Sequence, residues 1–178
     1  MTSYLRNFVP GGCFFFTANL ANRKLALLTM HIDLLREAFR KTRRRHPFTI
    51  DAIVVLPDHI HTVWTMPEGD ADFATRWRLI KSTFSHSLSG GEPISASRAA
   101  KRERGIWQRR YWEHTIRDQD DLTRHIDYIH INPLKHRLVD RVREWEASSF
   151  HRYVKLGTYP IDWAGDMSQD GRLYGERR

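Results

Sequence analysis

One stretch, FTIDAIVVLPDHIHTVWTM, constrains the fold more than any other part of the chain. Residues 48–56 are apolar and β-branched, which is typical of a buried strand. Residues 60–66 return with a similar character after Pro57 and Asp58, a pair that favours a turn. Two strand-like runs this close together predict a β-hairpin, so we expect an antiparallel sheet built around it.

Strand-like and helix-like segments alternate along the rest of the 178-residue chain, a length that suits one domain. Thr29 and Asp72 are the expected N-caps of the first two helices. The third helix is expected to end at Asn132, because a residue before proline disfavours the helical conformation. The expected strands span residues 13–19, 48–56, 60–66 and 106–116, and the expected helices span residues 29–45, 72–89 and 118–131.

This order of elements matches a ferredoxin-like fold of the α+β class, a split β-α-β sandwich with a central antiparallel sheet and an added helix. The small, polar and basic stretch SLSGGEPISASRAAKRERG is expected to be a surface loop. We place the main domain at residues 1–155 and a C-terminal extension at residues 156–178.

The charge balance predicts a polyanionic partner. The chain carries 29 Lys and Arg against 21 Asp and Glu, a formal net charge of +8, which favours nucleic acid over an acidic membrane surface. No run approaches the ~20 apolar residues that cross a bilayer. The single cysteine, Cys13, stands in no metal-binding spacing, which is typical of a reducing compartment. We therefore expect a cytoplasmic protein with no membrane partner.

Two histidines in the predicted hairpin could hold a metal ion. Side chains in a strand alternate between faces, so His59 and His61 point the same way. Neutral imidazole is the commonest protein metal ligand, and two rings on one face converge on one point. Local hydrogen bonding on a half-buried face is the alternative explanation of the pair, and the strand context favours the metal. A metal site would need a third ligand.

The third expected helix offers that ligand and a nucleophile. Asp121, His125, Tyr128 and Asn132 share one face of it, beside a separate apolar stripe, so Tyr128 is expected to lie off the core. The Asn132 amide could complete the metal site while the Tyr128 hydroxyl faces a phosphate. Alternatively, Tyr128 covers the core and Asn132 caps the helix. A tyrosine nucleophile needs a nearby cation, and N/O ligation suits Mg²⁺ or Mn²⁺ in phosphoryl transfer, although Zn²⁺ also binds histidine.

Several motifs resemble those of a known family. PDHIHTVW resembles the His-hydrophobic-His motif of the HUH nucleases. WQRRYWEH and IRDQDDLTRHIDYIHINPLKHRLV are similar to the REP-associated tyrosine transposases, relatives of the small single-tyrosine transposases that move single-stranded insertion sequences. The later stretch EWEASSFHRY also resembles that family, and the likeness covers about residues 14–163.

The resemblance implies a ferredoxin-like fold in which residues 1–155 form an HUH single-tyrosine transposase domain. It implies that Tyr128 is the nucleophile and that His59 and His61 hold the catalytic metal, Mg²⁺ or Mn²⁺. The expected substrate is single-stranded DNA next to a REP-like hairpin, which would be cleaved through a 5′-phosphotyrosine and rejoined. The broader family carries Gln where this chain has Asn132, and its members act as dimers, so we expect a monomer or a homodimer here.

Basic clusters are the expected DNA contacts, because grooves that hold single-stranded DNA are basic. Solvated helix faces would explain any one of them as well. Sequence recognition could come from the loop at residues 98–104 or from the segment after Tyr153. The expected contacts are Arg43, Arg44, Arg45, Arg76, Arg78, Lys81, Arg109, Arg110, Lys135, His136 and Arg137.

Three functions therefore compete. The first is a metal-dependent tyrosine transposase of the REP-associated class, active at the nucleoid. The second is a hairpin DNA- or RNA-binding protein without catalysis. The third is a zinc hydrolase in which the histidines activate water and Tyr128 is structural.

Overall fold

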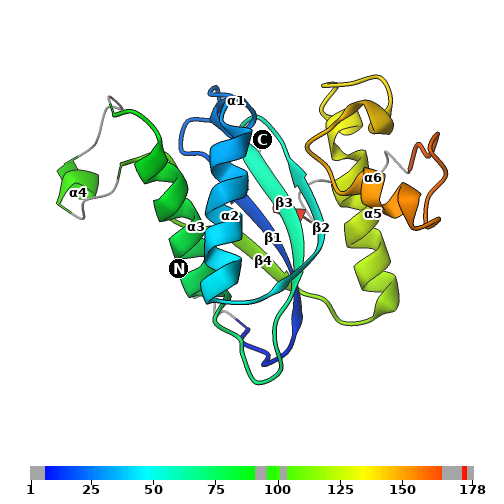
Figure 1. Ribbon diagram of the computed structural model, residues 1–178, viewed down its shortest axis with the longest axis horizontal. Helices are drawn as coiled ribbons and strands as arrows, with labels where there is room; N and C mark the ends of the chain where they lie inside the picture. The colour runs from blue at the N-terminus through cyan, green and yellow to red at the C-terminus, as the bar shows by residue number, and fades with distance from the viewer. Residues whose placement is uncertain (1–6, 91–95, 101–103, 166–173, 176–178) are drawn as a thin grey trace.

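The computed structural model describes residues 7–90, 96–100, 104–165 and 174–175 (Figure 1). In this part of the chain, helices flank a four-stranded antiparallel sheet. The strands, in the order β2-β3-β1-β4, are β1 (Cys13–Asn19), β2 (Thr49–Val55), β3 (His59–Thr65) and β4 (Trp112–Thr115). The helices are α1 (Leu27–Met30), α2 (Ile32–Arg45), α3 (Phe73–Ser87), α4 (Ala96–Ala99), α5 (Gln119–Lys135), α6 (Phe150–Lys155) and a 3₁₀ turn, η1 (Val142–Glu144).

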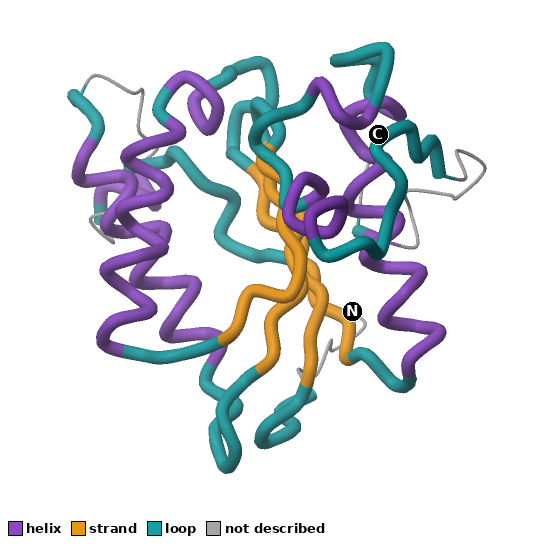
Figure 2. Tube along the Cα trace, turned by 45° about the vertical axis from the view of Figure 1, so that its right-hand side comes forward, coloured by secondary structure: helices purple, strands orange, loops and turns teal. Residues whose placement is uncertain are grey.

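Figure 2 shows the sheet between two helical layers, with α2 and α3 on one side and α5 on the other. The α+β ferredoxin-like prediction is confirmed, because strand order 4-1-3-2 is that of a split β-α-β sandwich. The hairpin prediction is also confirmed, since β2 pairs with β3 along their length around the Pro57 turn. Among the described helices, none combines the length and apolar character that crossing a bilayer requires.

Alternation along the central strands builds two separate cores. Phe14 and Phe16 of β1 pack toward α2 and α3, whereas Phe15 packs toward α5. In β3, Trp64 joins the first core and Val63 joins the second. Both faces of the sheet are therefore buried, which is why these strands contain so few charged residues.

Three expected boundaries differ from the structure. Thr29 lies inside the short helix α1, and α2 begins only after His31. The fourth strand is shorter than residues 106–116, although an isolated bridge pairs Leu20 with Trp107. The expected loop contains α4, and its residues 91–95 and 101–103 lie outside the described part of the chain.

The third helix continues past Asn132 and through Pro133, contrary to the prediction. Burial of Asn132 and Pro133 against the rest of the fold outweighs the local preference against helix before proline. The helix ends instead near Arg137, which adopts a left-handed conformation at φ 57°. The extra turn carries Lys135 back over the helix, toward the site described below.

Side-chain caps set the starts of the two long helices that follow the hairpin. The Asp72 carboxylate accepts a hydrogen bond from the Thr75 amide at 2.9 Å, which confirms it as the cap of α3. The Asp118 carboxylate accepts one from the Asp121 amide at 2.7 Å at the start of α5. These bonds satisfy amides that would otherwise lack a helical acceptor.

The prediction that Arg76 contacts DNA is wrong, because this side chain is only 2% exposed. Its guanidinium donates to the Asp70 carboxylate at 2.6 and 3.1 Å and to the backbone oxygens of Pro47 and Asp72. These bonds also hold the pKa of the Asp70 carboxyl below its usual range. Arg76 therefore joins the start of α3 to the segment that follows α2.

We expect Arg76→Ala to lower the free energy of unfolding by about 3 kcal/mol, because it removes a buried guanidinium and leaves its acceptors without a donor. Urea denaturation followed by circular dichroism measures the change. Arg78→Ala, on the exposed face of the same helix, is the control and should change stability by less than about 0.5 kcal/mol. Equal losses in the two variants would contradict the structural role of Arg76.

Candidate active site

The two histidines of β3 lie on the sheet face that α5 covers. His59 is 1% exposed and His61 is fully buried. Their ring centroids are 4.8 Å apart with the rings nearly perpendicular. The strand geometry expected from the sequence therefore brings the two imidazoles together.

A hydrogen bond fixes which nitrogen of His59 carries the proton. Nδ1 lies 2.6 Å from the Asp58 carboxylate, which can only accept, so Nδ1–H donates. Burial raises the pKa of Asp58, but the bonds from His59 and Arg23 outweigh it and lower that pKa to about 2. Burial lowers the pKa of His59, which favours the neutral ring. The neutral ring then carries its lone pair on Nε2.

His61 reaches the same state through a different partner. Its Nδ1 lies 2.8 Å from the Thr17 hydroxyl, which itself donates to the backbone oxygen of Tyr174 at 2.6 Å. Because that bond uses the hydroxyl proton, Thr17 must accept from Nδ1–H of His61. Each ring would thus bind a metal through Nε2, as the pairing of histidine ligands with second partners predicts.

Tyr128 of α5 faces this histidine pair. Its ring centroid lies 5.3 Å from that of His61, and the Lys135 ammonium lies 4.7 Å above the ring. Contrary to the expectation of an off-core side chain, Tyr128 is fully buried and belongs to the second core. The helix face that carries Tyr128 is itself the packing face of α5. The candidate nucleophile Tyr128 and the two histidines therefore belong to the same chain.

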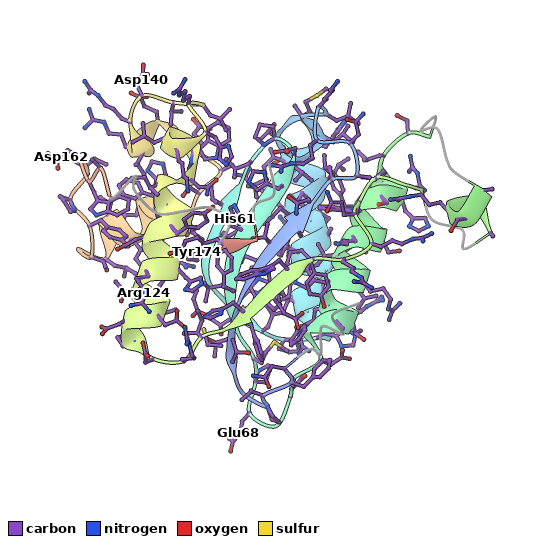
Figure 3. All side chains as sticks on the ribbon, turned by 180° about the vertical axis from the view of Figure 1, so that it is seen from behind. His61, Glu68, Arg124, Asp140, Asp162 and Tyr174 are labelled. Carbon is purple, nitrogen blue, oxygen red and sulfur yellow. The ribbon has the colours of Figure 1, made fainter. Side chains whose placement is uncertain are left out.

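Tyr174 covers that tyrosine. The Tyr174 ring stacks on Tyr128 with centroids 3.7 Å apart and an angle of 9° between the planes. In Figure 3, Tyr174 lies beside His61, between the sheet and α5. Sequence reasoning missed Tyr174, because a lone tyrosine far along the chain gives no local signal of this contact. It missed Thr17 and Arg23 for the same reason, and it named Asp58 only as a turn residue.

Apart from the buried Arg76, the other predicted site residues fall into two groups, those beside the histidines and those at the surface. Asn132 is fully buried one helical turn beyond Tyr128, and its role as a third ligand stays a prediction. Lys135 and His136 adjoin the site, since the His136 ring lies 5.2 Å from that of His59. The remaining expected DNA contacts lie at the surface and stay predictions: Arg43, Arg44, Arg45, Arg78, Arg109, Arg110 and Arg137 are exposed, and Lys81 is half-buried.

A second polar cluster lies at the start of α5. Nε2 of His114 is 2.7 Å from the Asp121 carboxylate, and Nδ1 of His125 donates to the Asp121 backbone oxygen at 2.7 Å. Burial raises the pKa of Asp121, but bonds from His114 and the Arg117 amide lower it to about 2. Ligand atoms of the three side chains lie within 4.8 Å of one another, so the cluster could hold a metal ion. Its hydrogen bonds also tie α5 to β4.

A tyrosine beside a pair of strand histidines is an arrangement suited to metal-assisted phosphoryl transfer. A model of the family described as "Transposase IS200 like" matches residues 16–132. The REP-associated tyrosine transposase of Escherichia coli (strain K12) is 48% identical over 168 residues, 94% of each chain. A relative from Haemophilus influenzae is 45% identical over 167 residues, 93% of this chain and 95% of its own.

A solved structure agrees with these sequence relatives. It is described as a REP-associated tyrosine transposase bound to a REP hairpin, and it superposes with a TM-score of 0.87 at 48% identity. The match covers 100% of this chain and 99% of that one. The chain therefore belongs to the IS200-like transposase family, among its REP-associated tyrosine transposases, and is an enzyme that acts on DNA.

We expect Tyr174→Ala to make Tyr128 react at least severalfold faster with tetranitromethane, because the substitution removes the ring that covers it. Mass spectrometry of the peptide that contains Tyr128 measures the nitration rate. Leu156→Ala, at a position that is 72% exposed beyond α6, is the control and should leave the rate unchanged. An unchanged rate in Tyr174→Ala would contradict the covering role.

Acid should destabilise the protein through His125, because burial lowers the pKa of this residue to about 4. Below about pH 6.5, His125 is protonated in the unfolded chain but stays neutral in the folded protein. The free energy of unfolding therefore falls as the pH decreases, until the pH reaches about 4. The shift corresponds to about 3 kcal/mol. The Asp121 carboxylate contributes little to the loss in this window, since the stability from its lowered pKa is lost only as the pH falls from the unfolded-state value of 3.8 toward about 2.

Urea unfolding of wild type, His125→Gln and the exposed control His86→Gln at pH 7 and pH 4.5 tests this. The fall in stability between the two pH values should be smaller by about 2 kcal/mol in His125→Gln than in wild type. The control should behave like wild type. A fall of wild-type size in His125→Gln would assign the acid sensitivity to other groups.

Proposed function

We propose that this protein is a metal-dependent tyrosine transposase that binds single-stranded DNA next to a REP-like hairpin, cleaves it and rejoins the strands. The observation that carries the proposal is the tautomer that the two histidines share, with the proton on Nδ1 and the lone pair on Nε2. Asp58 and Thr17 hold His59 and His61 with their Nε2 lone pairs in place beside Tyr128. The relative whose structure contains a REP hairpin supports the choice of substrate.

The proposed reaction exchanges one phosphodiester for another. Once the DNA displaces the Tyr174 ring that covers it, the Tyr128 hydroxyl loses its proton to solvent, and its oxygen attacks the phosphorus and forms the new P–O bond. The bond from phosphorus to the 3′-oxygen breaks, and that oxygen leaves as a 3′-hydroxyl after taking up a proton. The DNA retains a 5′-phosphotyrosine link, and attack by a 3′-hydroxyl reverses the step and rejoins a strand without an external energy source.

This chain's residues have separate tasks in that reaction. The Lys135 ammonium over the Tyr128 ring stabilises the negative charge that develops on the phenol oxygen. Packing of Tyr128 in the second core restricts the direction of attack. His59 and His61, with Asn132 as the proposed third ligand, would hold Mg²⁺ or Mn²⁺. When bound, the ion supplies Lewis-acid stabilisation of charge on the phosphate oxygens.

The competing functions differ in what Tyr128 does. A hairpin binder without catalysis would not require ligand histidines fixed through second partners. A zinc hydrolase would use the same histidines but would not require Tyr128 beside them. Action at the nucleoid, and the choice between monomer and homodimer, stay predictions, although one chain contains the histidines and the tyrosine together.

A labelled hairpin oligonucleotide with single-stranded flanks tests the proposal. After incubation with Mn²⁺, a denaturing gel should show protein linked to the 3′-labelled strand, whereas the 5′-labelled strand should yield a free shorter fragment. Tyr128→Phe should abolish the adduct and leave DNA affinity within about twofold. Tyr153→Phe is the matched control and should retain the adduct. Tyr153 lies on α6, and its hydroxyl donates to the backbone oxygen of Asp51.

The histidines are tested in the same assay. His59→Ala and His61→Ala should each lower the rate of adduct formation by at least about 100-fold, while the exposed control His86→Ala keeps it. Binding without an adduct under any metal would favour the hairpin-binding function. Metal-dependent cleavage that survives Tyr128→Phe would favour the hydrolase.

A further inference from the structure

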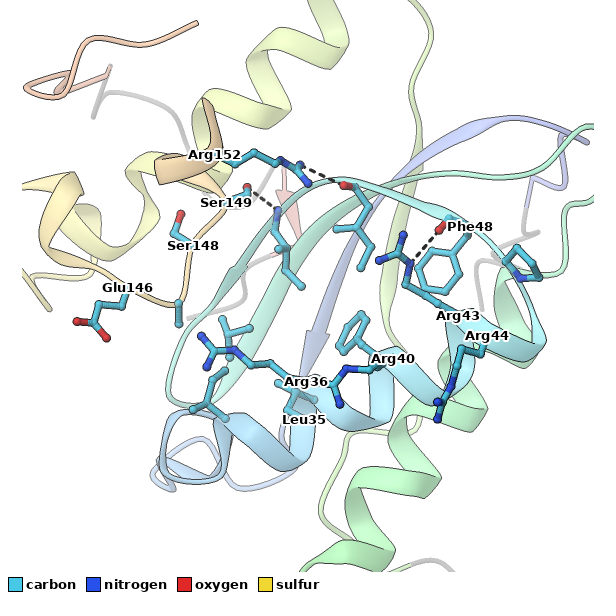
Figure 4. Close-up of a pocket in the computed structure, with 17 residues that line it drawn as sticks. Leu35, Arg36, Arg40, Arg43, Arg44, Phe48, Glu146, Ser148, Ser149 and Arg152 are labelled. Atoms are coloured by element: carbon cyan, nitrogen blue, oxygen red, sulfur yellow. Dashed lines mark hydrogen bonds between the residues drawn. The ribbon is translucent and has the colours of Figure 1, made fainter. Parts of the chain in front are cut away.

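A groove of about 660 Å³ lies between α2 and strand β2, on the sheet face away from α5 (Figure 4). Ile53 and Val55 of β2 line it and pack with the core beneath α2. His61 and Tyr128 lie in the opposite core, under α5. The groove is therefore separate from the site of strand cleavage.

Arginines form the rim of the groove. Arg36, Arg40 and Arg44 recur at every fourth position of α2, so they form a row with steps of about 6 Å along the helix. Their side chains are 54%, 62% and 68% exposed. Glu146 is the single acidic side chain among the described residues that line the groove. The five arginines that line it are Arg36, Arg40, Arg43, Arg44 and Arg152.

Local acidic partners do not cancel this charge. Arg36 pairs with Asp33, and Arg40 and Arg44 share Glu37. Ion pairs at this exposure are weak and readily exchanged for another anion. The row thus keeps its capacity to bind a polyanion.

The floor of the groove is apolar and its strand edge is already paired. Ile50 and Ile53 are half-buried at the floor. The Ile53 amide donates to the Ser149 hydroxyl at 2.9 Å, and Arg152 donates to the backbone oxygens of Ile50 and Asp51. An added peptide strand therefore lacks a free edge here, which argues against the commonest way in which a protein segment binds a sheet.

We propose that this arginine groove binds the single-stranded DNA that flanks the hairpin, with phosphates on the arginine row and bases over the apolar floor. The proposal rests on the proposed function and extends it to a second DNA contact. A positively charged groove that follows the backbone is the general form of a single-strand site, and the surface for the bases is here aliphatic instead of the more common aromatic platform. The net charge of +8 and membership of a DNA transposase family favour DNA over an acidic peptide.

Arg152 gives the groove continuity with the catalytic layer. It belongs to α6, which lies beside α5 in Figure 1, yet its guanidinium reaches the outer edge of β2. A strand that leaves the active site can thus follow positive charge around this edge of the sheet. Arg45, predicted with Arg43 and Arg44, lines a different hollow between α2 and α3.

The experiment compares two double variants, both in a Tyr128→Phe background so that binding is not covalent. Arg36→Ala with Arg40→Ala removes two groove charges. Lys41→Ala with Arg141→Ala removes two exposed charges that lie outside the groove and are not among the expected DNA contacts. Fluorescence anisotropy measures affinity for a REP-type hairpin with long single-stranded flanks, and for the same hairpin with its flanks trimmed.

The groove variant should bind the flanked hairpin about tenfold more weakly, and the slope of log affinity against log salt should fall by about 1.4 for two lost phosphate contacts. Its affinity for the trimmed hairpin should not change. The control variant should match the parent on both DNAs. A 4-thiothymidine in the flank should cross-link to peptides from α2 or β2.

Other results would overturn the proposal. If the groove variant bound the flanked and the trimmed hairpin equally weakly, the groove would bind the stem. If the groove variant and the control variant lost the same affinity, the effect would reflect overall charge and not the groove. Unchanged DNA affinity, with an acidic apolar peptide that only the groove variant fails to bind, would assign it to a protein partner. Failure of the proposed function gives a different result. The protein with Tyr128 would then form no adduct in the cleavage assay, while the binding assay would still show that affinity for the flank depends on the groove.

Discussion

Two hydrogen bonds beneath the histidines determine what this site can do. The Asp58 carboxylate and the Thr17 hydroxyl each accept Nδ1–H of one ring, so both neutral rings hold their Nε2 lone pairs for an ion. Without these bonds each ring could change tautomer or rotate. The bonds exist because the β2-β3 turn places Asp58 next to His59 and because β1 runs antiparallel beside β3, with Thr17 opposite His61. The sheet thus positions both histidines of the proposed catalytic site.

The same packing that positions the tyrosine also hides it. Tyr128 is a core residue of the α5 face, held between the sheet and Tyr174. Burial gives the ring a defined orientation, but in the proposed reaction a phosphodiester must reach its oxygen. The Tyr174 backbone oxygen accepts a hydrogen bond from Thr17 and the Tyr174 ring stacks on Tyr128, so this residue both completes the folded site and covers it. Access to the tyrosine therefore depends on contacts outside the catalytic motifs.

Much of the fold and the centre of the site could be predicted from local patterns. Period-two alternation placed the histidines on one face, and the cap residue Asp72 placed the start of α3. The errors arose where long-range packing overrides a local rule. Pro133 does not end α5, because the surrounding residues are buried, and Arg76 lies inside because Asp70 and backbone oxygens satisfy its guanidinium. A helical-face pattern could not tell that Tyr128 packs into the core.

The sequence by itself determined three features of the protein: a hairpin with two histidines on one face, a helix with one tyrosine, and a basic surface. These follow from backbone periodicity and side-chain type, which act over a few residues. Tertiary structure alone decided that Thr17 sets the tautomer of His61, that Tyr174 covers Tyr128, and that the arginines of α2 face a groove at the edge of β2. Such contacts join residues far apart along the chain, and they form only when the whole core packs.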